Sequence, residues 1–452
     1  MSKHDLSTLC YLRSSPGKKL EGMLKVPGDK SISHRSLIFA SQAVGHSTIE
    51  GLLEGDDVLR TGDALKKLGA VIERDDDGIW HVDGVGVGGL CEPNDILDLG
   101  NSGTGARLLM GLVSSYPFKT FFTGDASLRK RPMKRVSEPL AKMGAVFHAR
   151  TGGLLPMMVE GAAQPIPIEY TLPVASAQVK SAILLAALNI PGTTSVIEPI
   201  LTRDHTEKMM RFFGADMTVE DHKPSSGRII SIHGQPELKP QRIRVPGDPS
   251  SAAFIIVAAL IIPGSDVTIQ GVGMNPLRTG LFISLQEMGA DITWLNQREE
   301  AGEDVADIRV RYSQLKAIEV PAERAPSMID EYPILSIAAA FANGRTIMKG
   351  LHELRVKESD RLTAVAEGLK ACQIPHAIQD DTLVVEGTGT PPQGGGKVNT
   401  HHDHRIAMSF LVCGMAAQKP VTVDGAEMIQ TSFPGFTHLM QTLGAVIDKV
   451  DS

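Results

Sequence analysis

Short phrases rich in Lys and Arg recur in this sequence, and they favour a site that binds small anions. The phrase at residues 29–35 contains Lys30 and Arg35. The phrase at residues 127–135 holds five basic residues around Arg131, which a following proline should keep extended. Because the whole chain has a net charge of −7, these clusters are local, and no nucleic-acid partner or membrane surface is expected.

Lys30 is expected at the start of a helix, with Ser31 or Ser33 as the N-cap. A cation beside the positive end of a helix dipole is locally unfavourable, and a bound anion would reverse the sign of that interaction. We therefore interpret Lys30 as a ligand for an anion. The alternative is an exposed cation without a role.

Lys357 and Arg361 are four residues apart, with Glu358 and Asp360 between them. If the segment is helical, this like-charge pair costs about 0.2–0.5 kcal/mol, which an anion held between the two would offset. Pairing of the two cations with the neighbouring carboxylates is the alternative.

Asp330 and Glu331 lie directly before the apolar segment 334–340. A half-buried carboxylate in such a place can act as a general base. Acidic residues also stabilise the N-terminus of a helix, and this structural role is the alternative interpretation.

Three further motifs are informative mainly through what they exclude. The Gly-rich turn at 99–107 offers backbone N–H groups to a carboxylate or phosphate, but it lacks the Gly-Lys-Ser/Thr ending of a nucleotide-binding P-loop. Residues 84–89 match GxGxxG only by chance, because no helix is expected after them. The His-rich run 401–405 places neighbouring side chains on opposite faces, so no metal ion is expected there.

The elements that position these residues belong to a repeated architecture. The phrase Val-Pro-Gly-Asp at residues 26–29 reappears at 245–248, where Pro249 replaces Lys30. A helix that ends in Leu/Met-Gly-Ala recurs about six times, which predicts an α/β fold with three units per domain. We expect one domain at 27–244, a second formed by 1–26 plus 245–452, and an active site in the cleft between them.

The composition is that of a globular protein with two domains. The 452 residues are too many for one core, and 42% of them are hydrophobic. The four cysteines show no CxxC spacing, and residues 1–20 contain no apolar signal core. We expect reduced thiols, a cytoplasmic location and a monomer.

Taken together, the motifs resemble one family, that of 5-enolpyruvylshikimate-3-phosphate (EPSP) synthase. The matching phrases are Pro27-Gly28-Asp29-Lys30-Ser31-Ile32-Ser33-His34-Arg35, Gly100-Asn101-Ser102-Gly103-Thr104, Arg131-Pro132-Met133, Ser176-Ala177-Gln178-Val179-Lys180-Ser181, Thr202-Arg203-Asp204-His205-Thr206, Asp330-Glu331-Tyr332-Pro333, Arg355-Val356-Lys357-Glu358-Ser359-Asp360-Arg361 and Asp403-His404-Arg405. The resemblance runs from about residue 20 to 440. It implies two similar domains, each with three β-α-β-α-β-β units, in an inside-out α/β barrel.

The resemblance implies transfer of the enolpyruvyl group of phosphoenolpyruvate to the 5-hydroxyl of shikimate 3-phosphate, with release of phosphate. Both substrates are anions, which accounts for the basic phrases. The reaction belongs to the shikimate pathway, which supplies chorismate and aromatic amino acids. Phosphoenolpyruvate is already activated, so no metal ion or organic cofactor is expected.

The matching positions imply the site residues. Shikimate 3-phosphate would be held by Lys30, Ser31, Arg35, Ser176, Ala177, Gln178, Arg203, Asp330 and Lys357, most of them in the first domain. Phosphoenolpyruvate would be held by Lys30, Asn101, Gly103, Arg131, Gln178, Glu358, Arg361 and Arg405. Asp330 is the candidate for the hydroxyl proton, and Glu358 and Lys30 are candidates at the methylene group and the departing phosphate.

The sequence departs from the family pattern at one place. Many members carry a Lys near the final Thr-Phe-Pro, whereas residues 430–434 of this chain contain no cation. The phrases at 176–178 and 202–206 resemble the divergent, class II-like branch, which includes members that tolerate glyphosate. That branch can carry Ala where this chain has Gly103, so the branch resemblance alone does not imply tolerance.

Two alternatives remain. UDP-N-acetylglucosamine enolpyruvyltransferase has a similar fold and chemistry, but it typically uses a Cys in the loop that matches 127–134, and this chain has none there. A non-catalytic anion-binding protein on the same fold would not need Asp330 and Glu358 among the cations.

Overall fold

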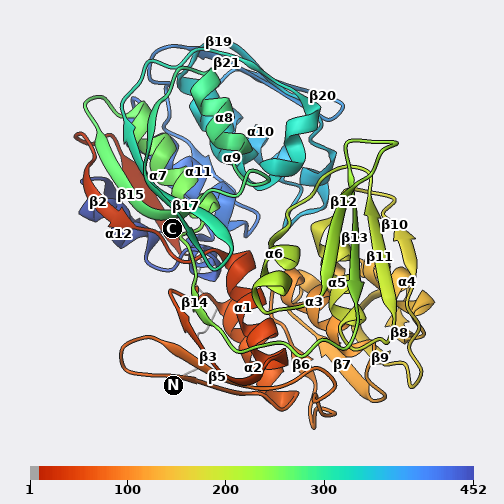
Figure 1. Cartoon of the computed structure of the whole chain (residues 1–452). Helices are drawn as coiled ribbons and strands as arrows, with labels where there is room; N and C mark the ends of the chain where they lie inside the picture. Colours follow the sequence, from red (N-terminus) through yellow and green to blue (C-terminus); the bar gives the residue numbers. More distant parts are fainter. Residues whose placement is uncertain (1–9, 452) are drawn as a thin grey trace. The chain divides into compact units, whose positions relative to one another are not determined.

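Six sheets of four strands each contain all the strands of the described chain. The computed structural model describes residues 10–451, so the first nine residues of the predicted second domain, and Ser452, lie outside it. The chain divides into two compact units (Figure 1). The first unit comprises Gly28–Pro246 and Glu299–Glu303, and the second comprises the other described residues.

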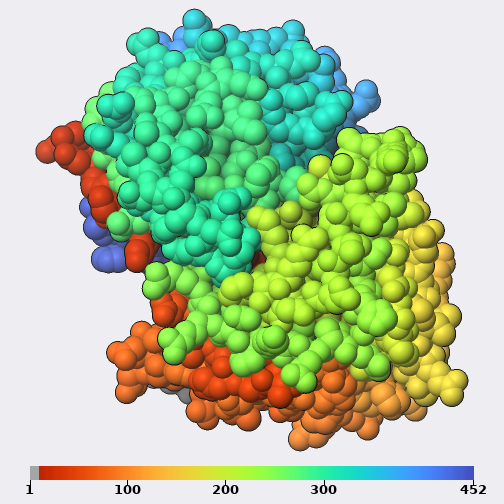
Figure 2. Space-filling view, in the orientation of Figure 1, coloured from red at the N-terminus to blue at the C-terminus, as the bar shows by residue number. Residues whose placement is uncertain are grey.

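The first unit contains three sheets. In spatial order they are β14 (Arg242–Arg244), β3 (Val44–Glu50), β5 (Trp80–Val85), β4 (Val71–Arg74); β6 (Leu97–Asp98), β7 (Lys119–Thr123), β9 (Leu154–Glu160), β8 (Val146–Arg150); and β10 (Glu169–Thr171), β11 (Thr193–Glu198), β13 (Arg228–His233), β12 (Met217–Asp221). Its helices are α1 (Lys30–Gln42), α2 (Asp56–Lys67), α3 (Gly103–Val113), α4 (Lys134–Lys142), α5 (Ala177–Ala187), α6 (His205–Phe212) and the short η1 (Leu128–Lys130). In Figure 2 the chain around β11, β12 and β13, coloured yellow-green, forms much of the visible surface of this unit.

The second unit repeats this plan. Its sheets are β16 (Asp291–Glu300), β17 (Glu303–Arg311), β15 (Asp266–Gly273), β2 (Glu21–Lys25); β18 (Glu319–Val320), β19 (Asn343–Met348), β21 (Thr382–Thr388), β20 (His376–Gln379); and β22 (Lys397–Val398), β23 (Val421–Val423), β1 (Tyr11–Ser15), β24 (Val446–Val450). Its helices are α7 (Pro249–Ile261), α8 (Gly280–Glu287), α9 (Tyr332–Phe341), α10 (Arg361–Ala371), α11 (His404–Ala416), α12 (Phe436–Thr442) and the short η2 (Ala322–Ser327), η3 (Ile329–Glu331), η4 (His352–Val356) and η5 (Ala426–Thr431).

Each sheet has the same internal order. An edge strand pairs in parallel with its neighbour, as β6 does with β7, and the neighbour pairs antiparallel with the next strand, as β7 does with β9. The run β6-α3-β7-α4-β8-β9 is the β-α-β-α-β-β unit implied by the resemblance. The expectation of a repeated α/β fold is therefore confirmed.

The predicted helix ends are also confirmed. The glycine after each recognised helix has a positive φ, at Gly69, Gly144, Gly214, Gly289 and Gly444. In the degenerate sixth unit, Gln373 adopts the same left-handed conformation with a φ of 59°. The turn therefore persists where the glycine is lost, although a side chain makes this conformation less favourable.

Helices α1, α3 and α5 of the first unit, and α7, α9 and α11 of the second, are the inner helices. All thirteen residues of α7 and all ten of α9 are buried. A helix that is apolar all round must be buried on all sides, which explains their place inside each unit. The predicted motifs at residues 29–35, 99–107, 176–181, 330–333 and 403–405 lie at the N-terminal ends of α1, α3, α5, α9 and α11, whereas the motif at 355–361 leads into α10.

Candidate active site

The start of α1 differs in one detail from the expectation. Asp29, not Ser31 or Ser33, is the N-cap, and its Oδ1 accepts a hydrogen bond of 2.8 Å from the Ile32 amide. The hydroxyl of Ser33 instead accepts a hydrogen bond of 3.0 Å from the Leu53 amide. The helix therefore begins earlier than an N-cap at either serine would allow, and Lys30 is its first residue.

Lys30 has a carboxylate partner that the sequence did not reveal. Its Nζ contacts Oδ2 of Asp57, a buried residue in the first turn of α2. The other oxygen of Asp57 accepts no hydrogen bond within the described residues. In the sequence, Asp56 and Asp57 at the start of α2 were the available signal for this partner. Two acids in the first turn, however, are equally typical of ordinary stabilisation of a helix start.

Arg35 lies in the same helix, α1, and its side chain is buried. Its Nε donates to the hydroxyl of Thr206 at 2.7 Å, its Nη2 to that of Ser181 at 2.9 Å, and its Nη1 to the Ser31 carbonyl at 2.9 Å. Burial lowers the pKa of Arg35 to about 10, although the charge of Glu207 opposes that effect. Arg35 thus links α1 to α5 and α6.

The second basic phrase gathers around Asn101. Arg131 is extended, as predicted, with φ −84° and ψ 127°. Its Nη2 donates to Asn101 Oδ1 at 2.7 Å and to the Ser127 hydroxyl at 3.0 Å. Gly103, the first residue of α3, lies directly beneath: a Cβ there would be 3.1 Å from Nη1 of Arg107 and 3.2 Å from Nη1 of Arg131.

Gln178 joins the starts of α3 and α5. Its carbonyl oxygen accepts a hydrogen bond of 2.8 Å from Arg107, and its amide donates to Thr104 at 3.0 Å. Ser176 caps α5 by accepting a hydrogen bond of 3.4 Å from the Val179 amide, and Ala177 is the first helical residue. Arg107, which was not among the predicted site residues, therefore belongs to this group.

The loop that carries Arg203 is anchored to α5 by a buried ion triad. Lys180 lies between Glu198, at 2.9 Å, and Glu207, at 2.6 Å, with all three side chains buried. Burial opposes the charge of Lys180, but the two carboxylates raise its pKa. Arg203, between β11 and α6, is near enough for its charge to lower the pKa of Arg35.

In the second unit, Arg361 is the centre of a group of carboxylates. Its Nε donates to Asp403 at 2.7 Å, its Nη1 to Asp330 at 3.0 Å, and its Nη2 contacts Glu358. Burial opposes ionisation of both Arg361 and Asp403, yet their mutual attraction raises the pKa of Arg361 and lowers that of Asp403.

Lys357 and Arg361 do not form the like-charge helical pair considered above. Lys357 precedes α10, whose first residue is Arg361, and both cations bind the same oxygen of Asp330, with Lys357 Nζ at 3.2 Å. The alternative of carboxylate pairing is correct: Arg361 contacts its neighbour Glu358, while the carboxylate shared by both cations is Asp330, which is distant in the sequence. The Asp330 carboxylate is therefore held between two cations.

Arg405 completes this group from the start of α11. Asp403 caps the helix and accepts a hydrogen bond of 2.9 Å from the Arg405 amide. The guanidinium Nη1 of Arg405 lies 3.2 Å from the Asp330 carbonyl oxygen and 3.4 Å from Oε1 of Glu331. Glu331 was singled out only as a neighbour of Asp330, so its contact with Arg405 is new.

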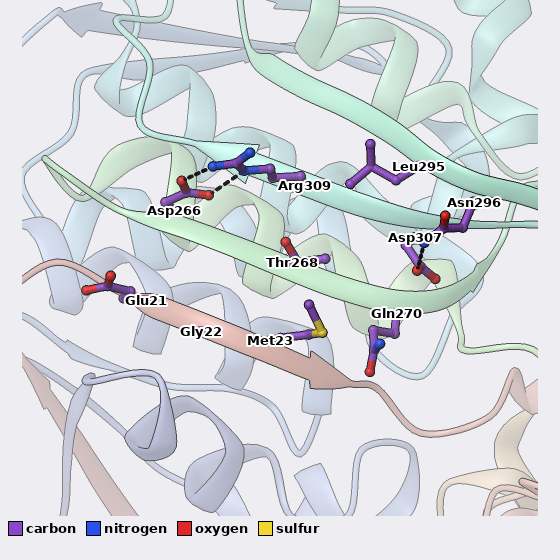
Figure 3. A pocket seen from close by; sticks show the side chains of 10 residues that line it. All are labelled: Glu21, Gly22, Met23, Asp266, Thr268, Gln270, Leu295, Asn296, Asp307 and Arg309. Carbon is purple, nitrogen blue, oxygen red and sulfur yellow. Dashed lines mark hydrogen bonds and ion pairs between the residues drawn. The ribbon is translucent and has the colours of Figure 1, made fainter.

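A surface hollow in the second unit lies apart from these groups. Figure 3 shows it over strands β2, β15, β16 and β17, with Arg309 bound to Asp266 and Asn296 bound to Asp307. No predicted site residue lines it. Since Arg309 already pairs with Asp266 and the hollow also contains the carboxylates of Glu21 and Asp307, it offers little to an anionic ligand.

The arrangement as a whole can bind anions and move protons. The first unit presents Lys30 and Arg131 at or near helix starts, and the second presents Lys357 and Arg405 beside Asp330 and Glu358. Planar guanidinium groups suit carboxylate and phosphate, and the interleaved carboxylates provide proton acceptors.

Comparison with known proteins agrees with this chemistry. The family model described as EPSP synthase (3-phosphoshikimate 1-carboxyvinyltransferase) matches residues 14–440. A 3-phosphoshikimate 1-carboxyvinyltransferase of Parvibaculum lavamentivorans is 61% identical over 444 residues, 98% of each chain. A relative of the same name in Paramagnetospirillum magneticum is 61% identical over 436 residues, 96% of this chain and 98% of the relative.

Solved structures give the same picture. An EPSP synthase from Acinetobacter baumannii superimposes with a TM-score of 0.88 at 45% identity, over 98% of this chain and 100% of that one. The enolpyruvyl transferase NikO from Streptomyces tendae superimposes with a TM-score of 0.79, over 98% and 99%, but at 20% identity it supports the fold alone.

Proposed function

The chain belongs to the EPSP synthase (3-phosphoshikimate 1-carboxyvinyltransferase) family, and we propose how its side chains divide the work of that reaction. The enzyme transfers the enolpyruvyl group of phosphoenolpyruvate to the 5-hydroxyl of shikimate 3-phosphate and releases phosphate. It thus serves the shikimate pathway towards chorismate and aromatic amino acids.

Shikimate 3-phosphate binds mainly to the first unit in this proposal. The residues are Lys30, Ser31, Arg35, Ser176, Ala177, Gln178 and Arg203, joined by Asp330 and Lys357. The support is that the starts of α1 and α5, linked through the hydrogen bond between Arg35 and Ser181, carry Lys30, Ser31, Ser176, Ala177 and Gln178. Helix N-termini favour bound phosphate. Because Arg35 already donates to three protein oxygens, we assign it chiefly to holding this group together.

Phosphoenolpyruvate binds to residues of both units in this proposal. They are Lys30, Asn101, Gly103, Arg131, Gln178, Glu358, Arg361 and Arg405. Arg131 and Arg405 are the most suitable direct ligands, since Arg361 is enclosed by three carboxylates. This assignment needs the two units to act together, and the substrates themselves would bridge them.

Asp330 is the proposed acceptor of the 5-hydroxyl proton, and its contact with Lys357 and Arg361 is the observation that carries the proposal. The two cations hold the carboxylate in place, so that it can take the proton as the hydroxyl oxygen attacks the enol carbon. The enol methylene gains a proton in the same addition. It then returns one as the adduct expels phosphate, with Glu358 and Lys30 proposed for these steps.

A phosphate-release assay tests the function. Release is expected only when phosphoenolpyruvate and shikimate 3-phosphate are both present. Release with UDP-N-acetylglucosamine as the acceptor would overturn the assignment, and no release with any acceptor would favour an anion-binding protein. The monomeric state and cytoplasmic location expected from the sequence stay predictions, which sizing and localisation measurements can test.

A further inference from the structure

The second copy of the Val-Pro-Gly-Asp phrase has no part in the proposed chemistry, yet it forms a buried polar site. Asp248 caps α7 and accepts a hydrogen bond of 3.0 Å from the Ser250 amide. Nη2 of Arg278 donates to the Ser250 hydroxyl at 2.9 Å and lies 3.3 Å from Asp248. All three residues are buried. Burial of polar groups costs less when they hydrogen-bond to one another, and one further residue joins this group.

That further residue is Glu331, which directly precedes α9. Its side chain makes no capping hydrogen bond to its own helix. Instead, Oε1 accepts a hydrogen bond from the Ser250 hydroxyl of α7 and lies 3.4 Å from Nη1 of Arg405 in α11. The buried carboxylate of the residue that precedes α9 therefore contacts the starts of α7 and α11.

The electrostatic potential where the starts of these three helices meet favours an anion. The N-terminal ends of α7, α9 and α11 each present partial positive charge, and Arg405 adds a full one. In the first unit the matching phrase supplies a cation, Lys30, at the start of α1. In the second unit Pro249 stands at that position, and the carboxylate of Glu331 occupies the site as an internal anion.

The contact with Glu331 constrains how Arg405 can be used. Both hydrogen bonds of the Arg405 guanidinium use Nη1, one to Glu331 and one to the Asp330 carbonyl oxygen. Within residues 10–451, the edge formed by Nη2 and Nε therefore has no protein acceptor. A guanidinium held by one nitrogen is pre-oriented, and its free edge matches the two oxygens of a carboxylate or phosphate.

We propose that Glu331 is a positioning residue for phosphoenolpyruvate binding: it holds Nη1 of Arg405, so that the opposite edge of the guanidinium faces the anionic substrate. Ser250 and Arg278 orient Glu331 in turn. This inference rests on the proposed role of Arg405 in phosphoenolpyruvate binding. It predicts that loss of the Glu331 charge affects one substrate and not the other.

The test compares the steady-state kinetics of the natural protein with those of Glu331→Gln, Glu287→Gln, Arg405→Lys and the double variant. Glu331→Gln keeps the size of the side chain but weakens its hold on Arg405. The KM for phosphoenolpyruvate is expected to rise about tenfold, within the range of coupling between neighbouring groups. The KM for shikimate 3-phosphate and kcat are expected to change less than about threefold, since the polar contacts of Glu331 are with Ser250 and Arg405 and not with the side chain of Asp330. Glu287→Gln, which removes the same charge from an exposed pair with Arg324 in this unit, is the matched control.

The Arg405→Lys variant and the double variant test the role of Arg405 separately from the role of Glu331. If Arg405→Lys leaves the phosphoenolpyruvate KM unchanged, the assignment of Arg405 fails and the role of Glu331 fails with it. If Arg405→Lys raises that KM but Glu331→Gln does not, only the positioning role is wrong. In the Arg405→Lys background, Glu331→Gln is expected to have little further effect, because it acts through Arg405.

Folding is monitored by thermal denaturation. A merely structural role would raise both KM values together with a loss of stability, and that result would contradict the proposal. Should Glu331→Gln not fold, Ser250→Ala removes the other hydrogen bond to Glu331 while leaving both charges in place. Ser250→Ala is expected to raise the phosphoenolpyruvate KM selectively but by a smaller factor, and equal changes in both KM values would again overturn the idea.

Discussion

Arg361 and Asp403 form an ion pair, with Nε and Oδ2 2.7 Å apart, in which the side chains are only 1% and 0% exposed. Such a pair tolerates burial because Arg361 also reaches Asp330 and Glu358, and because Asp403 caps α11. The same pair thus joins the starts of α10 and α11 and holds the general-base candidate in place. Substitution of either partner of this pair is therefore expected to lower the free energy of unfolding, whatever its effect on catalysis.

Asp403→Asn is expected to destabilise the protein by about 3–5 kcal/mol, because it removes one partner of a buried pair. The measurement is the free energy of unfolding in urea, with Glu287→Gln as the control for loss of an exposed acidic partner. The control is expected to change by less than about 1 kcal/mol. Equal effects of the two substitutions would show that the buried pair contributes no more than a surface one.

The lowered pKa of Asp403 predicts how the free energy of unfolding depends on pH. The pKa of Asp403 is lowered in the folded protein from its ordinary value of 3.8, since Arg361 outweighs the effect of burial. Stability from this group is therefore complete above about pH 4 and is lost as the pH falls through the lowered pKa. Unfolding followed between about pH 5 and 2 should show a steeper loss for the natural protein than for Asp403→Asn. Parallel curves would contradict the lowered pKa.

Asp330→Asn keeps the shape of the side chain but removes the proposed base. General acid–base catalysis contributes roughly 10²–10⁴-fold, so kcat is expected to fall by about that factor with little change in substrate affinity. Phosphate release under saturating substrates measures kcat, and calorimetric titration with shikimate 3-phosphate measures the affinity. A variant that retains kcat would remove Asp330 from the mechanism.

Gly103→Ala is expected to weaken inhibition by glyphosate, which in this family occupies the phosphoenolpyruvate site. The added methyl would lie 3.1–3.2 Å from the guanidinium groups of Arg107 and Arg131, so these must shift. Overpacking of this kind costs about 1–3 kcal/mol. The natural protein is expected to be inhibited, although it lacks the Lys that many relatives carry near Thr431, because a partly exposed charge contact is often worth less than about 1 kcal/mol.

The control for this experiment is Gly62→Ala, where the new methyl meets only Leu37 at an ordinary 3.6 Å. Inhibition constants for glyphosate and KM values for phosphoenolpyruvate are measured for all three proteins. The inhibition constant of Gly103→Ala is expected to change more than its KM. Equal inhibition of Gly103→Ala and Gly62→Ala would show that Gly103 does not line the inhibitor site.

Substrates are expected to draw the two units together. Cations proposed to bind substrate belong to both units, with Lys30, Arg131 and Arg203 in the first and Lys357 and Arg405 in the second. Like charges repel until an anion bridges them, and closure then excludes water. Small-angle scattering should show a smaller radius of gyration with shikimate 3-phosphate plus glyphosate than without ligands. An unchanged radius would contradict closure.

Much of this architecture could be predicted from local patterns. The Leu/Met-Gly-Ala endings located five helix ends, because a residue with positive φ is needed there and glycine meets that need at little cost. The proline after Arg131 correctly predicted its extended backbone. The basic phrases indicated anion binding, since their charge is a property of composition and not of packing.

The partners of those cations were decided only by the tertiary structure. Lys30 of α1 contacts Asp57 of α2, and Arg361 of α10 contacts Asp403, the N-cap of α11. Glu331 does not cap its own helix and instead accepts a hydrogen bond from Ser250 of α7. Helical periodicity shows which face of a helix is buried, but it carries no information about which other helix lies against that face. The sequence by itself therefore determined the repeat, the helix ends and the sign of the ligand's charge. The packing of the inner helices determined which carboxylate each cation holds, because those contacts join residues that are distant in the chain.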